Sequence, residues 1–250
     1  MRYNKIHALN LGQVSNMTSK HSVIFLHGTL GSSLDLKPLM DYFDQKEIKS
    51  LTFDFSGHGL TGKETKEFRI DLFARDLDNF IIQNNLSDPI IFGYSIGGYV
   101  ALYHKANYED SPIKTIFTYG TRFNWAEKSI QKEIPTMNPQ YILEKYPHTA
   151  EQLRKKHGER WQHLLHSTAH MMQHLERLDG LTREDMSEIS IPVIMMLGDQ
   201  DRVITSEETH LTRSWLRNSK VKTISHSKHE LERSNLKEIA STILENIDRF

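Results

Sequence analysis

Residues 89–106 read PIIFGYSIGGYVALYHKA, and this stretch decides the fold. The run Pro89–Phe92 predicts a buried strand, and Ile96–Ala106 predicts a helix. Between them lies a G-x-S-x-G pattern centred on Ser95. A sharp turn from strand to helix strains the serine backbone and lifts its hydroxyl clear of the sheet. Glycine at both ends lets neighbouring backbone pass close by, so the pattern indicates a nucleophilic serine. A plain glycine-rich turn is the alternative.

Strand-like and helical patterns alternate on both sides of this turn. Short apolar, β-branched runs predict strands over Ser22–Leu26, Leu51–Phe55, Ile113–Tyr119, Ile191–Leu197 and Val221–Ser225. Apolar residues at helical spacing predict helices over Asp35–Phe43, Ile70–Asn84, Ser206–Leu216 and Leu236–Ile247. Before Ser22, only Ile6–Leu11 is strand-like. Continuous apolar strands separated by helices predict an α/β fold with a mostly parallel central sheet and helices on both faces.

The alternation stops between Arg122 and about Ser187, where the patterns are helical. The simplest interpretation is a helical cap inserted into the sheet. We therefore expect residues 1–121 and 188–250 to form the core and residues 122–187 to form the cap. Aromatic residues and methionines are frequent in the insertion, which favours a lid over an apolar substrate pocket. The alternative is that most of them pack the lid against the sheet.

Composition narrows the class of protein. Of the 250 residues, 38% are hydrophobic and 25% are charged, as expected for a globular chain with a full core. The absence of cysteine excludes disulfides, thiolate metal sites and a cysteine nucleophile. With 31 basic and 32 acidic residues, the net charge is close to zero, so the sequence lacks the basic excess expected for binding nucleic acid or an anionic membrane. No apolar run is long enough for a membrane span and the N-terminus lacks a signal-peptide pattern, so we expect a cytoplasmic protein.

Four further motifs follow in the order typical of one family. They are His27–Ser32 (HGTLGS), Phe53–Gly59 (FDFSGHG), Leu197–Val203 (LGDQDRV) and Lys228–Glu232 (KHELE). Together with the serine turn, they make the chain resemble the α/β-hydrolase fold family from about Ser22 to Phe250. The first resembles the family's HG-x-x-G loop and the second its D-x-x-G-H-G turn. The third resembles its acid loop and the fourth its catalytic-histidine loop.

The resemblance implies a triad of Ser95, His229 and Asp201. A serine hydroxyl is a weak nucleophile until a base removes its proton, and an acid must orient that base. His229 is the candidate base, with His226 as its rival. Asp201 is the candidate acid because the second aspartate of its loop matches the family position, and Asp199 is the competitor.

The resemblance also implies an oxyanion hole made by the backbone N–H groups of Thr29 and Ile96. Ile96 follows the nucleophile, and Thr29 is its counterpart in the HG-x-x-G loop. The expected substrate pocket is lined by His27, Tyr94, Phe123, Trp125, Met171 and Met172. No metal and no cofactor is expected.

Three other patterns suggest different chemistry, and each is open to objection. Gly57–Gly62 matches the G-x-G-x-x-G of dinucleotide sites, but the polar stretch after it does not open a helix. His229–Arg233 begins like H-E-x-x-H yet has arginine in fifth place. The third is a stripe of four histidines on one helical face: His163, His166, His170 and His174. A pair of them four residues apart is a metal-binding alternative, although we expect this face to point to solvent or to the edge of the cap.

These residues favour a serine hydrolase that cleaves a small or medium carboxylic ester through an acyl-enzyme. A thioesterase, an amidase or a carbon–carbon bond hydrolase would use the same triad, because fold does not fix function. Dehalogenase and epoxide-hydrolase relatives carry aspartate where Ser95 stands, which disfavours those activities. A ligand receptor or regulatory protein with slow or single turnover is the alternative from another class. The expected partner is a small acyl substrate rather than a nucleic acid or a membrane.

Overall fold

The computed structural model of this protein describes residues 22–175 and 180–247. Their strands form one sheet in the order β2-β1-β3-β4-β5-β6, and every neighbouring pair is parallel. The strands are β1 (Ser22–Leu26), β2 (Lys49–Thr52), β3 (Ile90–Tyr94), β4 (Thr115–Tyr119), β5 (Val193–Gly198) and β6 (Ser219–Ile224). The chain moves from β1 outward to β2 and then returns past β1 to β3. Ligand sites in such sheets lie at the carboxyl edge beside the strand where the order reverses.

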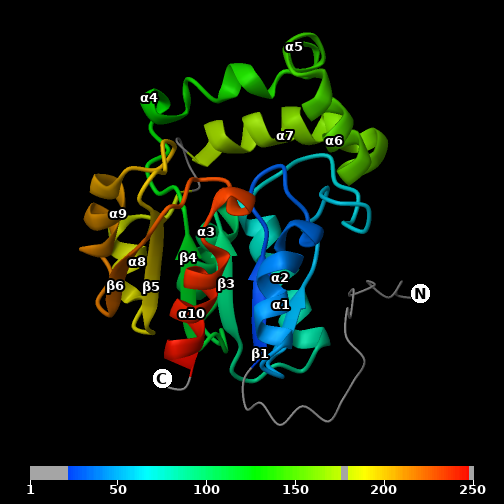
Figure 1. Ribbon diagram of the computed structural model, residues 1–250. Coiled ribbons are helices and arrows are strands. Elements are labelled where there is room, and N and C mark those ends of the chain that lie inside the picture. The colour runs from blue at the N-terminus through cyan, green and yellow to red at the C-terminus, as the bar shows by residue number, and fades with distance from the viewer. Residues whose placement is uncertain (1–21, 176–179, 248–250) are drawn as a thin grey trace.

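Helices cover both faces of the sheet (Figure 1). They are α1 (Lys37–Asp44), α2 (Ile70–Gln83), α3 (Ile96–Asn107), α8 (Arg183–Glu188), α9 (Ser206–Arg213) and α10 (Leu236–Ile247). Phe25 and Phe92 pack on the side of α1 and α10, while Ile24 and Ile91 pack on the side of α2, α3 and α8. Because both faces are buried, the central strands are continuous apolar runs rather than alternating ones.

A further layer of helices lies over the carboxyl edge of the sheet (Figure 1). We call them the upper helices: α4 (Glu127–Ile130), α5 (Pro139–Lys145), α6 (Pro147–His157) and α7 (Trp161–His174). Their buried hydrophobic side chains, Trp161 and Leu164 among them, belong to the same apolar cluster as those of α2 and α3. The upper helices are therefore packed onto the rest of the fold through a shared core. Helix α8, which follows later in the chain, contacts α3 beside the sheet.

The predicted fold class is confirmed, while some bounds of elements differ. We predict a strand over Leu51–Phe55, but its pairing with β1 ends at Thr52. Phe55 is buried nonetheless, because its ring stacks on Phe73 of α2 with 5.0 Å between centroids. An apolar run therefore predicts which residues are buried, but the strand itself can end before the run does. The strand-like run Ile6–Leu11 lies outside the described residues.

The strand β6 forms one margin of the described sheet. Two lysines of this strand, Lys220 and Lys222, are exposed. The ammonium of Lys222 lies 3.1 Å from a carboxylate oxygen of Glu238 on α10. Strand β6 therefore presents lysine side chains to solvent.

Candidate active site

The turn between β3 and α3 holds Ser95 in a backbone conformation that few residues adopt. Its φ and ψ are 51° and −118°, which strains an L residue. The N–H of Ser95 donates to the carbonyl of Tyr119 at 2.8 Å, and Thr121 Oγ1 donates to the carbonyl of Ser95 at 3.0 Å. These bonds from the end of β4 offset the strain and fix the serine at the carboxyl edge of the sheet.

Close backbone approach explains the glycines of this turn. A Cβ on Gly97 would lie 2.6 Å from the carbonyl oxygen of Leu26 and 2.8 Å from that of His27. A Cβ on Gly93 would lie 2.3 Å from the backbone nitrogen of Gly98. No flexible side chain can move away to relieve these clashes. The expectation that only glycine fits at both positions is therefore confirmed.

His229 and Asp201 form a hydrogen-bonded pair, with Nδ1 of the ring 2.9 Å from Oδ2 of the carboxylate. The Asp201 side chain is fully buried, and its other oxygen accepts from the N–H groups of Val203 (2.8 Å) and Ile204 (2.9 Å). Burial alone raises the pKa of Asp201, but the hydrogen bonds from His229 and the two N–H groups hold that pKa below its usual value. A carboxylate here fixes the proton of a neutral His229 on Nδ1 and leaves Nε2 as its acceptor.

The two rival residues have other partners. Asp199 is exposed, and its Oδ1 accepts from the N–H of Ser227 at 3.0 Å. Hydrogen bonds from the backbone of Ser227 and His226 lower the pKa of Asp199. His226 itself is exposed and has a left-handed φ of 52°. The fold therefore brings His229 together with Asp201 and uses Asp199 to close a turn.

Two residues at the end of β4 support this pair, and neither is among the site residues predicted from the sequence. Tyr119 Oη donates to the carbonyl of Lys228 at 2.5 Å, directly before His229. Burial raises the pKa of Tyr119 to about 12, so the phenol remains a donor. Gly120 has a φ of 58°, and a Cβ there would lie 3.2 Å from Nδ1 of His229. A glycine directly after a predicted strand is the sequence signal that points to this close approach.

A cavity of about 260 Å³ connects the serine with the histidine. Thr29, Ser95 and His229 all line it. Arg122 and Glu133 also line it and form an ion pair there, with the guanidinium 5.9 Å from the centroid of the Trp125 ring. This charged pair is a second feature of the site that no sequence pattern predicts.

Tyr94, Trp125 and Met172 line the cavity, as expected for pocket residues, whereas His27, Phe123 and Met171 do not. His27 is fully buried, and its Nε2 accepts from the N–H of Phe55 at 3.1 Å. Its Nδ1 therefore carries the proton and donates to the carbonyl of Gly28 at 2.9 Å. Burial lowers the pKa of His27, which keeps the ring neutral. Its place in the HG-x-x-G motif reflects this structural role.

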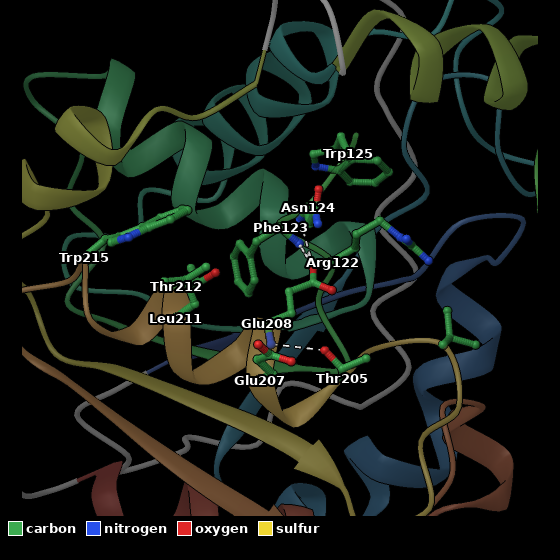
Figure 2. A pocket seen from close by; sticks show the side chains of 11 residues that line it. Arg122, Phe123, Asn124, Trp125, Thr205, Glu207, Glu208, Leu211, Thr212 and Trp215 are labelled. Carbon is green, nitrogen blue, oxygen red and sulfur yellow. Dashed lines mark hydrogen bonds between the residues drawn. The ribbon is translucent and has the colours of Figure 1, made fainter. Parts of the chain in front are cut away.

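Phe123 lines a neighbouring groove of about 680 Å³, shown in Figure 2. The groove shares Arg122, Trp125 and Val203 with the cavity, so the two are adjacent. The carboxylate of Glu208 accepts from the N–H of Phe123 at 2.7 Å and from that of Asn124 at 2.8 Å. This bond from α9 fixes the start of the connection to the upper helices. Met171 is buried in the apolar cluster, one helical step away from Met172.

A second serine–histidine–aspartate cluster lies before β4, toward the amino edge of the sheet. His104 Nε2 lies 3.1 Å from Asp78 Oδ1, and His104 Nδ1 lies 3.0 Å from Ser111 Oγ. The ring is fully buried and stacks on Tyr108 with 4.3 Å between centroids. The two ring nitrogens have the opposite partners from those of a catalytic histidine, whose Nδ1 faces the acid. This cluster joins α2, α3 and the loop before β4.

Two of the three patterns that suggest other chemistry, Gly57–Gly62 and the histidine stripe, contribute no residue to the lining of the cavity. Gly57–Gly62 forms a loop, and the next helix, α2, begins only at Ile70. In the histidine stripe, His163, His166 and His170 are exposed, and Nε2 of His163 lies 3.0 Å from the carbonyl oxygen of Thr65. Among residues 22–175 and 180–247, no group of three or more potential ligand side chains is arranged to hold a metal. None of the helices in these two ranges has the length and apolar character to cross a membrane.

Proteins of known type resemble this chain in sequence. A putative esterase/lipase 2 of Mycoplasma genitalium is 32% identical over 84 residues, which cover 33% of this chain and 31% of that protein. A 2-succinyl-6-hydroxy-2,4-cyclohexadiene-1-carboxylate synthase of Yersinia pestis is 32% identical over 82 residues, which cover 33% of this chain and 29% of that protein. The alignment therefore spans about a third of the length of these curated relatives.

Solved structures share the fold over nearly the whole chain. NosK from Streptomyces actuosus superposes with a TM-score of 0.78 at 16% identity, over 91% of this chain and 97% of that one. An esterase from Exiguobacterium antarcticum superposes with a TM-score of 0.74 at 17% identity, over 92% of each chain. The family described as serine aminopeptidase, S33, matches residues 18–234. The chain therefore belongs to this family and has the fold of an α/β hydrolase.

Proposed function

We propose that this protein is a serine hydrolase that cleaves a carboxylic ester through an acyl-enzyme. One observation carries the proposal: Ser95, held at a strained turn, and His229, oriented by Asp201, line the same cavity. A nucleophile next to a base that is itself oriented by an acid is the arrangement that acyl transfer requires. The esterase names of several relatives support an ester as the substrate.

In the proposed reaction, His229 Nε2 takes the proton of Ser95 as Oγ bonds to the acyl carbon. The electrons of the carbonyl double bond move to its oxygen. When they return, the bond to the alcohol oxygen breaks, and the alcohol leaves with the proton from His229. Water then attacks the acyl-enzyme with His229 again as base, releasing the acid and restoring Ser95. Asp201 keeps the other ring nitrogen protonated throughout.

The N–H groups of Thr29 and Ile96 are the proposed donors to the oxyanion. Ile96 is the first residue of α3, so its N–H has no acceptor inside the helix and lies at the positive end of the helix dipole. Thr29 follows Gly28, and a Cβ on Gly28 would lie 3.3 Å from Cβ of Ser95. The loop after β1 therefore passes directly beside the nucleophile, as an oxyanion donor must.

We also propose that residues 122–187 act as a lid on a core made of residues 1–121 and 188–250. Trp125, Met137 and Met172 come from this segment and line the cavity. The cavity volume of about 260 Å³ lies just below the usual range for ligand pockets, about 300–1,000 Å³. Its size supports a small acyl group rather than a long chain.

A fluorophosphonate probe tests the nucleophile. We expect the probe to label the native protein, and we expect no labelling of Ser95→Ala. Ser111→Ala is the matched control, because Ser111 also donates toward a histidine but lies at the other cluster. It should be labelled and should hydrolyse p-nitrophenyl acetate like the native protein. Labelling that persists in Ser95→Ala, or is lost only in Ser111→Ala, would contradict the proposal.

A further inference from the structure

The last residue of α6, His157, reaches from the upper helices into the core, where its side chain is buried. Its Nδ1 lies 2.9 Å from the backbone nitrogen of Gly59, and its Nε2 lies 3.0 Å from the carbonyl oxygen of Leu30. The N–H of Gly59 can only donate, so Nδ1 must be unprotonated. The proton is therefore on Nε2, which donates to the carbonyl of Leu30. Both ring nitrogens are used, and a single neutral tautomer satisfies them.

The acceptor of this bond is in a strained turn. Leu30 has a φ of 58°, a left-handed value that costs energy for a residue with a Cβ. It is the third residue of the turn Gly28–Gly31, which is closed by a 3.0 Å bond from the N–H of Gly31 to the carbonyl of Gly28. The peptide before Leu30 leads back to Thr29, whose N–H is a proposed oxyanion donor. The bond from His157 therefore holds the turn from which that donor projects.

Two charged neighbours of His157 attach the same region of the upper helices to the core. Lys156 Nζ lies 2.7 Å from Oδ2 of Asp35, which belongs to the short 3-10 helix Ser33–Leu36 after β1. Arg160 donates to the carbonyls of Gly59 and Gly62, each at 3.0 Å. These bonds place α6 against the loops after β1 and β2. Of the three side chains, His157 is the one that bonds to the Gly28–Gly31 turn.

The surroundings of His157 keep its ring neutral. The ring of His58 lies next to it in the core, with 6.2 Å between the two centroids, and the ring of His27 lies 5.0 Å from that of His58. Lys156 and Asp35 also face it. Burial is the main cause that lowers the pKa of His157, to about 4. The tautomer that the turn requires is therefore the form present near neutral pH.

We propose that His157 is a positioning residue for the reaction: its bond to the Leu30 carbonyl holds the Gly28–Gly31 turn in the form that presents the Thr29 N–H to the oxyanion. The inference rests on the proposed function of Ser95. The bond from His157 couples the packing of α6 against the core to the formation of the oxyanion hole. A lid that lifts α6 away also releases the turn.

Two substitutions at position 157 separate the two bonds. In His157→Asn, the amide oxygen takes the place of Nδ1, which keeps the bond from Gly59 and removes the donor to Leu30. In His157→Gln, the amide nitrogen takes the place of Nε2, which keeps the donor to Leu30 and removes the other bond. Each variant loses one buried hydrogen bond, so their stabilities should be similar. His163→Asn is the matched control, because His163 also bonds from an upper helix to a core carbonyl, that of Thr65.

The measurement is kcat and KM on p-nitrophenyl acetate, expressed per site that the fluorophosphonate titrates, so that a partly unfolded sample still yields a valid kcat. Loss of one oxyanion donor typically lowers kcat by about 10²–10³-fold. We expect His157→Asn to lose about 10- to 100-fold in kcat with KM within about twofold, since a misplaced donor retains part of its effect. The rate at which fluorophosphonate reacts with Ser95 should fall in parallel. His157→Gln should keep most of kcat, and His163→Asn should keep all of it.

A rescue variant adds a readout that a purely structural role would not move. Glycine adopts a left-handed backbone without strain, so Leu30→Gly should restore much of the kcat lost in His157→Asn. Equal losses in the asparagine and glutamine variants, or native kcat in His157→Asn, would overturn the proposal. Activity that persists in Ser95→Ala would overturn the proposed function instead, so the two failures are distinguishable.

Discussion

The surroundings of a hydrogen-bonded carboxylate and imidazole determine whether the pair is reactive or structural. His229 pairs with Asp201 through Nδ1 and lines a cavity. His104 pairs with Asp78 through Nε2 and is sealed in the core. Only the first ring turns an acceptor nitrogen toward a space that a substrate can enter. At the scale of single residues, the ring nitrogen used and the exposure of the ring distinguish a reactive group from a structural one.

Asp201→Asn should retain the fold and lose activity. The amide can no longer enforce a proton on Nδ1 of His229, so the ring adopts the wrong tautomer, and kcat should fall by a factor on the order of 10⁴. Asp199→Asn should lose much less, because Asp199 only accepts from the backbone of the next loop. Measuring kcat/KM for both variants on one ester, with matched thermal unfolding curves, separates them. An inactive Asp199→Asn beside an active Asp201→Asn would reverse the assignment.

The residues of the serine turn can be predicted from sequence because their constraint is local. Gly93 is required by the backbone of Gly98 in the same turn, and this requirement is reflected in a short motif. His157 has no such signature, because its partners Gly59 and Leu30 lie 98 and 127 residues away. The left-handed backbone of Leu30 also has no sequence signature, since leucine rarely adopts this conformation. Contacts between distant loops emerge only when the chain is folded.

At the scale of helices and strands, the residues that are buried are not always the residues that form the backbone hydrogen bonds of an element. Helix α9 ends at Arg213, although the apolar pattern predicts a helix to Leu216. Leu216 is buried without being helical, because the chain turns back toward β6 and still packs it in the core. The existence and order of strands and helices follow from hydrophobic period. Their ends depend on where pairing or capping stops, which the period does not encode.

Gly97→Ala tests how closely α3 packs against β1. In an exposed helix this change stabilises by about 0.5–1 kcal/mol, because alanine is the better helix former. Here the new Cβ would meet two backbone carbonyls, the nearer at 2.6 Å. We expect the clash to dominate and the free energy of unfolding to fall by about 1–3 kcal/mol, as in overpacked cores. Urea unfolding measures the sign, and a stabilised variant would refute the close packing.

At the scale of the whole molecule, buried histidines link stability to pH. Burial is the main cause that lowers the pKa of His27, His58, His104 and His157. A histidine with a depressed pKa in the folded state binds fewer protons than the same residue in the unfolded chain, whose pKa is near 6.5. Protons therefore favour the unfolded chain at pH values between the folded and unfolded pKa. The fold is most stable above this window and loses stability as the pH falls through it.

The urea midpoint should therefore drop between about pH 7 and pH 5. Each such histidine contributes up to about 1.4 kcal/mol per pH unit where only the unfolded form is protonated. Replacing His157 by glutamine should lower the slope of unfolding free energy against pH by about one proton. A midpoint independent of pH over this range would mean that these rings bind protons equally in the folded and unfolded states.

The exposed lysines of β6 have a consequence for encounters between molecules. A strand from a second copy that paired along this margin would set its own side chains beside Lys220 and Lys222. The ammonium groups would then lose part of their hydration, which costs free energy. Charged side chains on outer strands commonly protect sheets from edge-to-edge association in this way. Acetylation of the two lysines would remove that protection while leaving every catalytic contact in place. The lysines of β6 thus disfavour the addition of a further strand at this margin of the sheet.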